Sequence, residues 1–145
     1  MGNPFTVSLV GWHDGEPLLK SVREAVFIRE QKVPAELEWD GLDQGARHAL
    51  ALSHRGDAIG CGRMFADGHI GRISVLQQWR KQKVGTAIME ALLDYAQAHD
   101  YKQVDVDAQT HAVPFYHSLG FAEQGREFMD AGLPHIKMTL KLPGR

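Results

Sequence analysis

Apolar and polar residues alternate in several short stretches of the chain, which is the pattern of strands with one buried face. In residues 5–12 the apolar side chains fall on every second position, and Asp14-Gly15 is expected to end that strand. Asp57 and Asp67-Gly68 separate three later stretches, which predicts antiparallel neighbours joined by tight turns. The further predicted strands are residues 48–54, 58–66, 69–76 and 103–108, a strand that begins at 121–123, and residues 135–142.

Elsewhere the apolar residues recur three or four positions apart, which predicts amphipathic helices. Residues 17–31 show this spacing, and Pro34 is expected to end it. Residues 82–99 carry the clearest apolar stripe, and residues 111–119 form a shorter helix. The acidic segment 35–46 has little periodicity, which favours a short helix followed by a loop.

The predicted order of elements is β-α-(α)-β-β-β-α-β-α-β-β. It indicates an α+β fold, with helices layered on both faces (α/β/α) of a mixed, mostly antiparallel sheet. One strand–helix–strand unit spans residues 69–108. Such crossovers are right-handed almost without exception, so its two strands should lie parallel. Ligands gather beyond the carboxyl ends of strands in sheets of this kind, which places the expected site where residues 69–76 and 103–108 end.

Composition narrows the classes of protein that the chain can represent. Its 145 residues fit one domain, residues 1–145, and the net charge of −2 argues against binding to nucleic acid or a membrane surface through bulk charge. Residues 1–12 lack the features of a signal peptide, and no run approaches the about 20 apolar residues of a membrane span. Cys61 is the only cysteine, so a reducing, cytoplasmic location is expected, with no disulfide and no multi-cysteine metal site.

The segment most informative about chemistry is residues 73–87, where a strand ends, a basic loop follows and a long helix begins. Free backbone amides at a helix N-terminus favour an anion, and Arg80, Lys81 and Lys83 add positive charge. Gly85 lets the backbone approach a ligand closely. The loop therefore fits a pyrophosphate, or alternatively an exposed basic loop that binds nothing. It matches neither the G-x-G-x-x-G motif nor the P-loop motif of nucleotide-binding proteins.

Two segments carry a resemblance to a known superfamily. Residues 80–87, RKQKVGTA, resemble the R/Q-x-x-G-x-G/A loop of the GNAT N-acetyltransferases, and residues 112–121, AVPFYHSLGF, resemble their second signature. Residues 26–34, 107–110 and 128–135 are similar to the ElaA/YjcF-like branch of that superfamily. The resemblance covers nearly the whole chain, although this branch brings no assigned substrate with it.

The resemblance implies acyl transfer from acetyl-CoA, or a related acyl-CoA, to a primary amine by direct attack, without a metal. The acyl-CoA would lie between two splayed parallel strands, residues 69–76 and 103–108. The Val75 amide would polarise the thioester carbonyl, Tyr116 would protonate the leaving thiolate, and Glu30 lies in the region that lines the acceptor site and is the candidate base. The residues expected to bind the acyl-CoA are Ile73, Val75, Arg80, Lys81, Gln82, Lys83, Val84, Gly85, Thr86, Gln109 and Tyr116.

One position departs from the signature. Lys83 stands where the family usually has its first loop glycine when Arg80 is taken as the first residue of the signature. If the backbone there needs a positive φ, lysine costs stability. Because a loop that feeds a helix can use right-handed angles, we expect Lys83 to adopt them and to add a charge beside the phosphates.

Several other acidic residues and histidines could carry the amine proton. The carboxylates of the 35–46 segment (Glu36, Glu38, Asp40 and Asp43) are expected to be solvated surface charges. Asp105 and Asp107 lie on a predicted central strand, where burial would demand partners, and Arg72 and Arg63 are the expected ones. His111 and His135 could relay protons, and Cys61 is expected to serve packing.

Two alternatives to an enzyme stay open. The same fold could hold acyl-CoA as a sensor or docking module with little turnover, or the loop could be a remnant in an interaction protein. The sequence does not identify the amine, and it leaves a homodimer open, for which the apolar C-terminal strand is the candidate interface.

Overall fold

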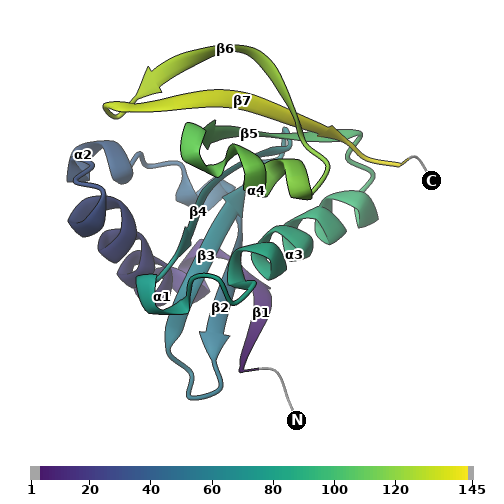
Figure 1. The fold of residues 1–145 in the computed structure, drawn as a ribbon. Helices are drawn as coiled ribbons and strands as arrows, with labels where there is room; N and C mark the ends of the chain where they lie inside the picture. Colours follow the sequence, from purple (N-terminus) through teal and green to yellow (C-terminus); the bar gives the residue numbers. More distant parts are fainter. Residues whose placement is uncertain (1–3, 144–145) are drawn as a thin grey trace.

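A computed structural model describes residues 4–143; the ends of the expected domain, residues 1–3 and 144–145, lie outside the described residues. Seven strands form one sheet in the order β1-β2-β3-β4-β5-β7-β6 (Figure 1). All neighbours are antiparallel except β4 and β5, which confirms the mixed α+β fold. The strands are β1 (Phe5–Val10), β2 (Arg47–Ser53), β3 (Ala58–Met64), β4 (His69–Val75), β5 (Gln103–Gln109), β6 (Ala122–Asp130) and β7 (Leu133–Lys141).

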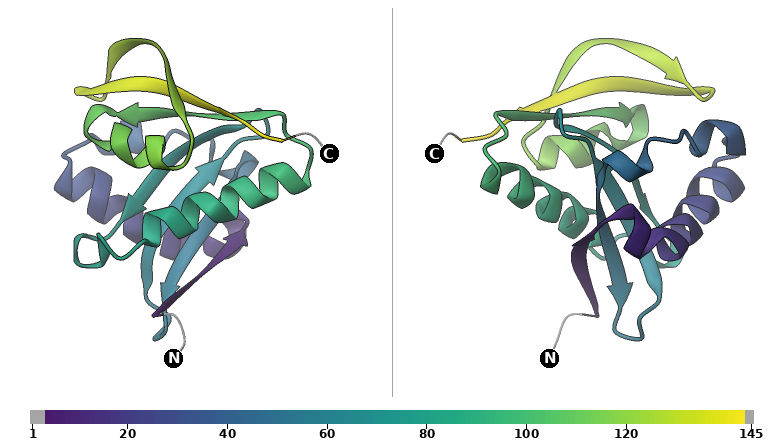
Figure 2. Two further views of the ribbon diagram at one scale, coloured as in Figure 1. Left: turned by 45° about the vertical axis from the view of Figure 1, so that its right-hand side comes forward. Right: turned by 180° about the vertical axis from the view of Figure 1, so that it is seen from behind.

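Helices cover both faces of the sheet. Helix α3 lies in front of β2 and β3 in Figure 1, whereas α1 comes forward in the rear view of Figure 2. Because neighbouring residues of a strand face opposite sides, Ala49 and Ala51 pack under α3 while Leu50 packs under α1. The helices are α1 (Trp12–Arg23), its continuation as a π-helix η1 (Glu24–Glu30), α2 (Ala35–Glu38), α3 (Val84–Ala98) and α4 (Val113–Ser118), with 3₁₀ turns η2 (Asp43–Gly45), η3 (Gln77–Trp79) and η4 (Thr110–Ala112).

The first helix begins earlier than the sequence predicts. Asp14-Gly15 lies inside α1, which starts at Trp12, so the expectation that this pair forms a break is wrong. The reason is packing: a Cβ at Gly15 would lie 2.8 Å from Val10 Cγ2 and 3.0 Å from Leu19 Cδ1. Glycine is needed there because α1 turns back closely onto the strand that precedes it.

The two parallel strands separate soon after they meet. Pairing between β4 and β5 is confined to His69 with Asp105 and Ile70 with Val106, and β5 then continues alongside β7. The strands therefore splay towards their carboxyl ends, as expected. This V-shaped opening is where a ligand can reach the backbone of β4.

The C-terminal hairpin completes one side of the sheet. Strand β7 lies between β5 and β6, so both of its edges are paired within the chain and only its faces could contact a second copy. The free edge on that side belongs to β6, which is exposed along its length. Among residues 4–143, no helix is long and apolar enough to cross a membrane.

Candidate functional site

A cleft of about 1160 Å³ opens at the splay of β4 and β5. Its walls come from η1, the bulged second half of β4, the loop before α3, the end of β5, α4 and the β6–β7 turn. Every residue that the sequence predicts to act in catalysis or acyl-CoA binding lines it, except Gln82, whose side chain donates to the Gln78 carbonyl at 3.2 Å. Those that line it are Glu30, Ile73, Val75, Arg80, Lys81, Lys83, Val84, Gly85, Thr86, Gln109 and Tyr116.

The Val75 amide is aimed into the opening by the alternation of the ladder. The Leu76 amide donates to the Ile59 carbonyl at 2.9 Å, towards β3. In an antiparallel ladder, successive residues direct their backbone groups to opposite sides. The Val75 N–H therefore faces the side where β5 has diverged, and it is available to an extended ligand that lies along β4.

A bulge in β4 gives this strand its bend. Cys61 pairs with Ser74 but Arg63 pairs with Gly71, so β4 carries one extra residue between these pairs. Arg72 lies in the bulge with a φ of 55°, which is uncommon for a residue other than glycine. The bulge directs the second half of β4 away from β5 and widens the cleft.

The loop before α3 presents backbone amides that precede the helical ladder. The Ala87 amide makes the first bond of that ladder, to the Lys83 carbonyl at 3.0 Å. The amides of Val84, Gly85 and Thr86 come before it and have no carbonyl acceptor within the helix, so they can donate to a ligand. A helix N-terminus of this kind favours an anion.

The backbone of Lys83 corrects one expectation. Lys83 has a φ of 68° and a ψ of 18°, in the left-handed region rather than the expected right-handed one. Lys81 is also left-handed, with a φ of 64°. The loop must reverse direction within a few residues to feed α3, and these two lysines bear the strain at positions where a glycine would be free of it.

Gly85 leaves room at the start of α3. A Cβ built there would make only ordinary contacts, 3.5 Å from the Phe115 ring and 3.8 Å from Val75 Cγ2. Packing within the protein therefore does not require a glycine at position 85. The space beside Gly85 lies on the cleft side, between α3, α4 and the end of β4.

Arg80 joins the basic loop to the opposite wall. Its guanidinium forms a bidentate pair with the Glu30 carboxylate, at 2.7 and 2.6 Å, and its Nε donates to the Val75 carbonyl at 3.0 Å. The hydrogen bonds from Arg80 hold the pKa of Glu30 below its ordinary value. Both oxygens of Glu30 are thus engaged, which makes this carboxylate a weaker base than a free one.

Tyr116 lies on the other side of the cleft, on α4. The side chain is packed edge-on against Phe115 and Phe121, and only 8% of the residue is exposed. Burial raises the pKa of its phenol to about 12. The hydroxyl therefore stays protonated at neutral pH and is a hydrogen-bond and proton donor on this side of the cleft.

Comparison with known proteins identifies this arrangement. A family model described as an acetyltransferase (GNAT) domain matches residues 16–142. The chain belongs to the GNAT acetyltransferase family. It is 40% identical over 121 residues to YjcF of Bacillus subtilis (strain 168), an uncharacterized N-acetyltransferase, with 81% of this chain and 86% of the relative covered.

Solved GNAT structures agree with this assignment. The crystal structure of Escherichia coli ElaA is 27% identical with a TM-score of 0.83, covering 92% of this chain and 98% of that one. A GNAT family acetyltransferase from Elizabethkingia anophelis with acetyl-CoA bound gives a TM-score of 0.72, covering 97% of this chain and 100% of that one. At 16% identity, this second likeness concerns the fold alone.

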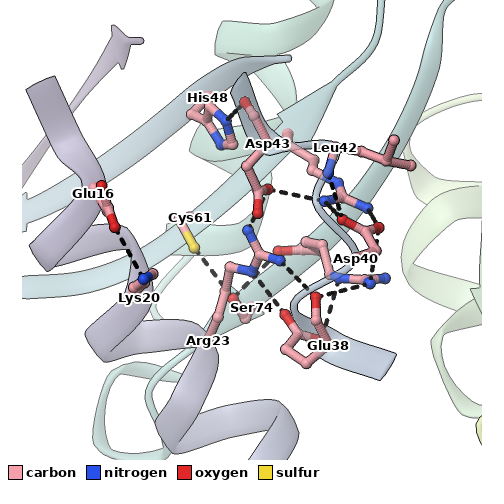
Figure 3. A network of polar contacts seen from close by, with 12 residues as sticks. Glu16, Lys20, Arg23, Glu38, Asp40, Leu42, Asp43, His48, Cys61 and Ser74 are labelled. Atoms are coloured by element: carbon pink, nitrogen blue, oxygen red, sulfur yellow. Dashed lines mark hydrogen bonds and ion pairs between the residues drawn. The ribbon is translucent and has the colours of Figure 1, made fainter. Parts of the chain in front are cut away.

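A cluster of ion pairs joins α1 and the loop after α2 to β3 and β4, and Glu38, Asp40 and Arg72 of this cluster line the GNAT cleft. Arg23, which is 1% exposed, donates to Glu38 at 2.7 Å and to Asp43 at 2.6 Å (Figure 3). The expectation that Glu38 and Asp43 are solvated is wrong, because the loop after α2 folds inwards over Arg23. Burial raises the pKa of Glu38, whereas the arginines around Asp43 outweigh burial and lower its pKa.

Arg63 and Arg72 belong to this cluster and not to β5. Arg63 pairs with Asp40 at 2.5 Å and with Asp43 at 2.9 Å, and Arg72 pairs with Glu38 at 3.2 Å and Asp40 at 3.3 Å. The expected pairing of these arginines with Asp105 and Asp107 is therefore wrong. The physical reason is the left-handed bulge, which places Arg72 over α2.

The partner of the β5 carboxylates is a histidine that no sequence motif singles out. His69 Nδ1 lies 2.5 Å from Asp105 Oδ1, and His69 Nε2 lies 3.7 Å from Asp107 Oδ2. Its only sequence signal is its place at the start of the strand that precedes the basic loop. The register that brings it beside Asp105 requires knowledge of how the parallel strands pair.

Three further expectations concern residues near the cleft. His111 and His135 both line it, and His135 Nδ1 is bonded to the Leu133 carbonyl at 2.8 Å. Gln109 exchanges side-chain hydrogen bonds with Gln31, at 2.9 and 3.4 Å, which ties the end of β5 to η1. Cys61 is buried beside Ser74, and burial raises the pKa of its thiol to about 11, in line with a packing role.

Proposed function

We propose that this GNAT protein is an acetyl-CoA-dependent N-acetyltransferase that transfers an acetyl group to a primary amine by direct attack. The observation that carries the proposal is the convergence of three groups on one cleft. These are the amides that open α3, the inward-facing Val75 amide and the protonated phenol of Tyr116. The similarly folded acetyltransferase from Elizabethkingia anophelis has acetyl-CoA bound, which is consistent with this donor.

The residues present fit the donor. The first amides of α3 suit a pyrophosphate, and Lys81 and Lys83 add positive charge beside them. The pantetheine arm would lie along the free edge of β4 near Ile73 and Val75, as an added strand does. The space beside Gly85 admits a ligand at close range. When bound, acetyl-CoA supplies an activated thioester.

Two groups of this chain act at the thioester. The Val75 N–H stabilises negative charge on the carbonyl oxygen as the amine attacks, which is the role of an oxyanion hole. Tyr116 donates its proton to the sulfur as the carbon–sulfur bond breaks. The phenol is protonated throughout the neutral range, so its proton is in place when the sulfur leaves.

The Glu30–Arg80 pair revises the hypothesis for the base. Because Arg80 engages both oxygens of Glu30, we propose that this carboxylate chiefly fixes Arg80 and, through it, the Val75 carbonyl. Arg80 and the end of β4 are then held in register before the donor arrives. A different group must take the amine proton.

Location and assembly are further parts of the proposal. A cytoplasmic location is supported by the single cysteine, which lies buried rather than in a disulfide. If a homodimer forms through the C-terminal hairpin, the exposed β6 edge is available for strand pairing, because β7 is paired on both sides.

The test is Tyr116→Phe in an assay of CoA-thiol release with a panel of amines. We expect turnover to fall about 100-fold or more, with little change in acetyl-CoA affinity, because the ring still packs and only the proton donor is lost. Affinity is read from the rise in melting temperature with acetyl-CoA. Unchanged turnover would refute the acid role. Wild-type protein that binds acetyl-CoA but acetylates no amine would favour the acyl-CoA-binding sensor instead. If millimolar acetyl-CoA caused no thermal shift, both the acetyltransferase and the sensor would be refuted.

A further inference from the structure

A histidine at the start of β7 lines the cleft beside the end of β5. His135 pairs with Gln109 in the β5–β7 register, and opposite residues of an antiparallel pair share one face of the sheet, with Cα atoms about 5 Å apart. The Gln109 side chain is bonded to Gln31, the residue after η1, so this is the face towards η1. His135 is 8% exposed, and Phe128 stacks on its ring at 5.8 Å between centroids. The imidazole is therefore held in one place at the wall of the cleft.

The hydrogen bond of His135 to the backbone sets its tautomer. The partner of Nδ1 is the Leu133 carbonyl at 2.8 Å, and a carbonyl oxygen can only accept, so Nδ1 carries the proton. In the neutral ring the lone pair is then on Nε2. Within residues 4–143, Nε2 has no hydrogen-bond partner, and it is not sealed from solvent. The ring thus presents an unoccupied proton acceptor to the cleft, as a general base must.

His135 lies at the same end of the cleft as the Val75 amide. Strands β4 and β5 run parallel, and Val75 and Gln109 are their last residues, so Val75 and the Gln109–His135 pair belong to the same end of the sheet. A continuous series of neighbours and side-chain bonds bridges the two strand ends, and it runs through His135, Gln109, Gln31, Glu30, Arg80 and the Val75 carbonyl. An acceptor seated between these strand ends meets His135 on one side and the Val75 amide on the other.

The proposed acid is brought to this end by the connectivity of the chain. The turn η4 and helix α4 follow Gln109 directly, and α4 carries Tyr116. Phe115, next to Tyr116, and Val75 both lie within 4 Å of the place that a Cβ at Gly85 would take. The phenol, the Val75 amide and His135 are thus grouped around the carboxyl ends of β4 and β5.

The wall of the cleft on the side of η1 leaves few other groups free to take a proton. The β6–β7 turn lies beside α2 in Figure 1 and in the rear view of Figure 2, and most side chains that η1, α2 and this turn bring to the cleft are apolar. They include Val26, Phe27, Val33, Leu37, Ala131 and Leu133. Of the carboxylates there, Glu30 is paired with Arg80 and Asp40 with Arg63.

The remaining titratable groups near the ring are less well placed. Asp130 at the end of β6 and His111 in η4 line the cleft, but both are exposed, and within residues 4–143 no hydrogen bond orients either side chain. Asp107 lies two residues before Gln109 and faces His69, and Lys137 lies two residues after His135 with its side chain exposed. His135 alone among these groups combines a fixed ring with a free acceptor atom.

We propose that His135, with its tautomer fixed by the Leu133 carbonyl, is the base that takes the proton of the acceptor amine, directly or through one water molecule. This inference rests on the proposed acetyltransferase function and names the group that activates the acceptor. Glu30 then positions Arg80, as its bidentate pair indicates.

The protons balance. The ammonium gives one proton to His135 Nε2 and becomes a neutral amine, which forms the carbon–nitrogen bond with the acetyl carbonyl. As the carbon–sulfur bond breaks, the sulfur takes the proton of Tyr116. The second proton leaves the nitrogen as the carbonyl forms again and replaces, through solvent, the one that Tyr116 gave. The imidazolium releases its proton to solvent, so one proton leaves per turnover.

The test compares His135→Asn with wild type on two amines of similar size, ethylamine and trifluoroethylamine. Asparagine keeps a side-chain N–H that can donate to the Leu133 carbonyl, but it has no basic nitrogen in place of Nε2. At neutral pH ethylamine is largely protonated, whereas trifluoroethylamine is largely neutral and needs no base to become a nucleophile. We expect kcat/KM for ethylamine to fall about 100-fold and that for trifluoroethylamine to be spared. Activity on ethylamine should recover as the pH rises towards about 10, the pKa of an alkylammonium.

Controls separate this inference from the proposed function. His54→Gln, in the exposed turn between β2 and β3, should behave as wild type. The thermal shift with acetyl-CoA shows that a variant keeps its donor site, and His135→Gln is compared in the same way if His135→Asn loses that shift. Loss of the shift in both variants would make His135 structural and overturn the assignment.

The two amines give the remaining outcomes. Equal loss on both, or no loss on either, in a variant that still binds acetyl-CoA would overturn the base assignment while the acetyltransferase function stands. Wild-type protein that acetylates neither amine, nor any of the wider amine panel, would overturn both.

Discussion

Variants of Lys83 can separate two properties of the loop before α3: its left-handed backbone and its positive charge. Its backbone is left-handed, with a φ of 68°, at the position where the family signature usually has a glycine. The side chain is exposed and lies at the cleft, beside the amides that open α3. Replacing Lys83 with glycine removes the strain and the charge together, whereas replacing it with alanine removes the charge and keeps the strain.

The expected magnitudes follow from the backbone angle. A left-handed residue with a Cβ costs about 1–2 kcal/mol relative to the right-handed form, a cost that glycine does not bear. Glycine also makes the unfolded chain more flexible, which lowers the free energy of unfolding by about 0.5–1 kcal/mol and offsets part of this gain. Lys83→Gly should therefore gain about 0.5–1 kcal/mol in free energy of unfolding. For a chain of this size that is a rise of about 1–4 °C in Tm. Lys83→Ala should gain nothing.

The same pair of variants reports on charge when acetyl-CoA is added. Both lose a cation that lies near the expected diphosphate, and an exposed ion pair is worth up to about 1 kcal/mol. Each should bind acetyl-CoA about 2- to 5-fold more weakly at low salt, with the difference from wild type shrinking as salt rises. Thermal melts and calorimetric titration at two salt concentrations provide the measurements. Equal stability of the glycine and alanine variants would refute the strain argument, and unchanged affinity in both would refute the charge argument.

Two further predictions concern the packing of β3 and the loop after α2. In Gly62→Ala, the new Cβ would lie 2.4 Å from Ile73 Cδ1, so the Ile73 side chain must move. We expect the free energy of unfolding, measured in urea, to fall by about 1–3 kcal/mol. Gly71→Ala on β4, where a new Cβ would have nothing within 4 Å, is the matched control and should show no comparable loss. Burial raises the pKa of Asp40, but hydrogen bonds from Arg63 and the Leu42 amide outweigh it and hold the pKa at about 2. Because this value lies below that of the unfolded chain (about 3.9), the contribution is complete above about pH 4 and is lost as the pH falls towards 2. Asp40→Asn should therefore flatten the fall of Tm over that range, and an equally steep fall would contradict the assignment.

Periodicity predicts most of the fold because it reports which face of each element is buried. The strand and helix order is confirmed, including the parallel crossover, since alternation and helical spacing are properties of local sequence. Boundaries fail where a tertiary contact decides them. Asp14-Gly15 reads as a turn by composition, yet the close approach of Val10 and Leu19 makes this glycine part of a helix.

The candidate site divides in the same way. The part that is expected to hold acyl-CoA follows from contiguous motifs, and Val75, Gly85 and Tyr116 of these motifs line one cleft. The polar contacts elsewhere in the cleft depend on which side chains meet across elements. Arg63 and Arg72 choose the loop after α2 because a bulge redirects β4, and no local pattern predicts a bulge at Arg72. The place of His69 beside Asp105 is hidden from the sequence for the same reason.

The distribution of charge in and around the cleft indicates where a cationic group would bind. In the cluster under α1 and α2, three arginines meet three carboxylates, so that region is neutral without a ligand: the arginines are Arg23, Arg63 and Arg72, and the carboxylates are Glu38, Asp40 and Asp43. Glu30 is likewise neutralised by Arg80. At the apex of the splay, in contrast, two carboxylates share one histidine, and within residues 4–143 Lys137 makes no ion pair with Asp107 despite their register. This apex therefore carries more negative than positive charge, and it is the part of the cleft, on the β5 side, that would attract a cationic group.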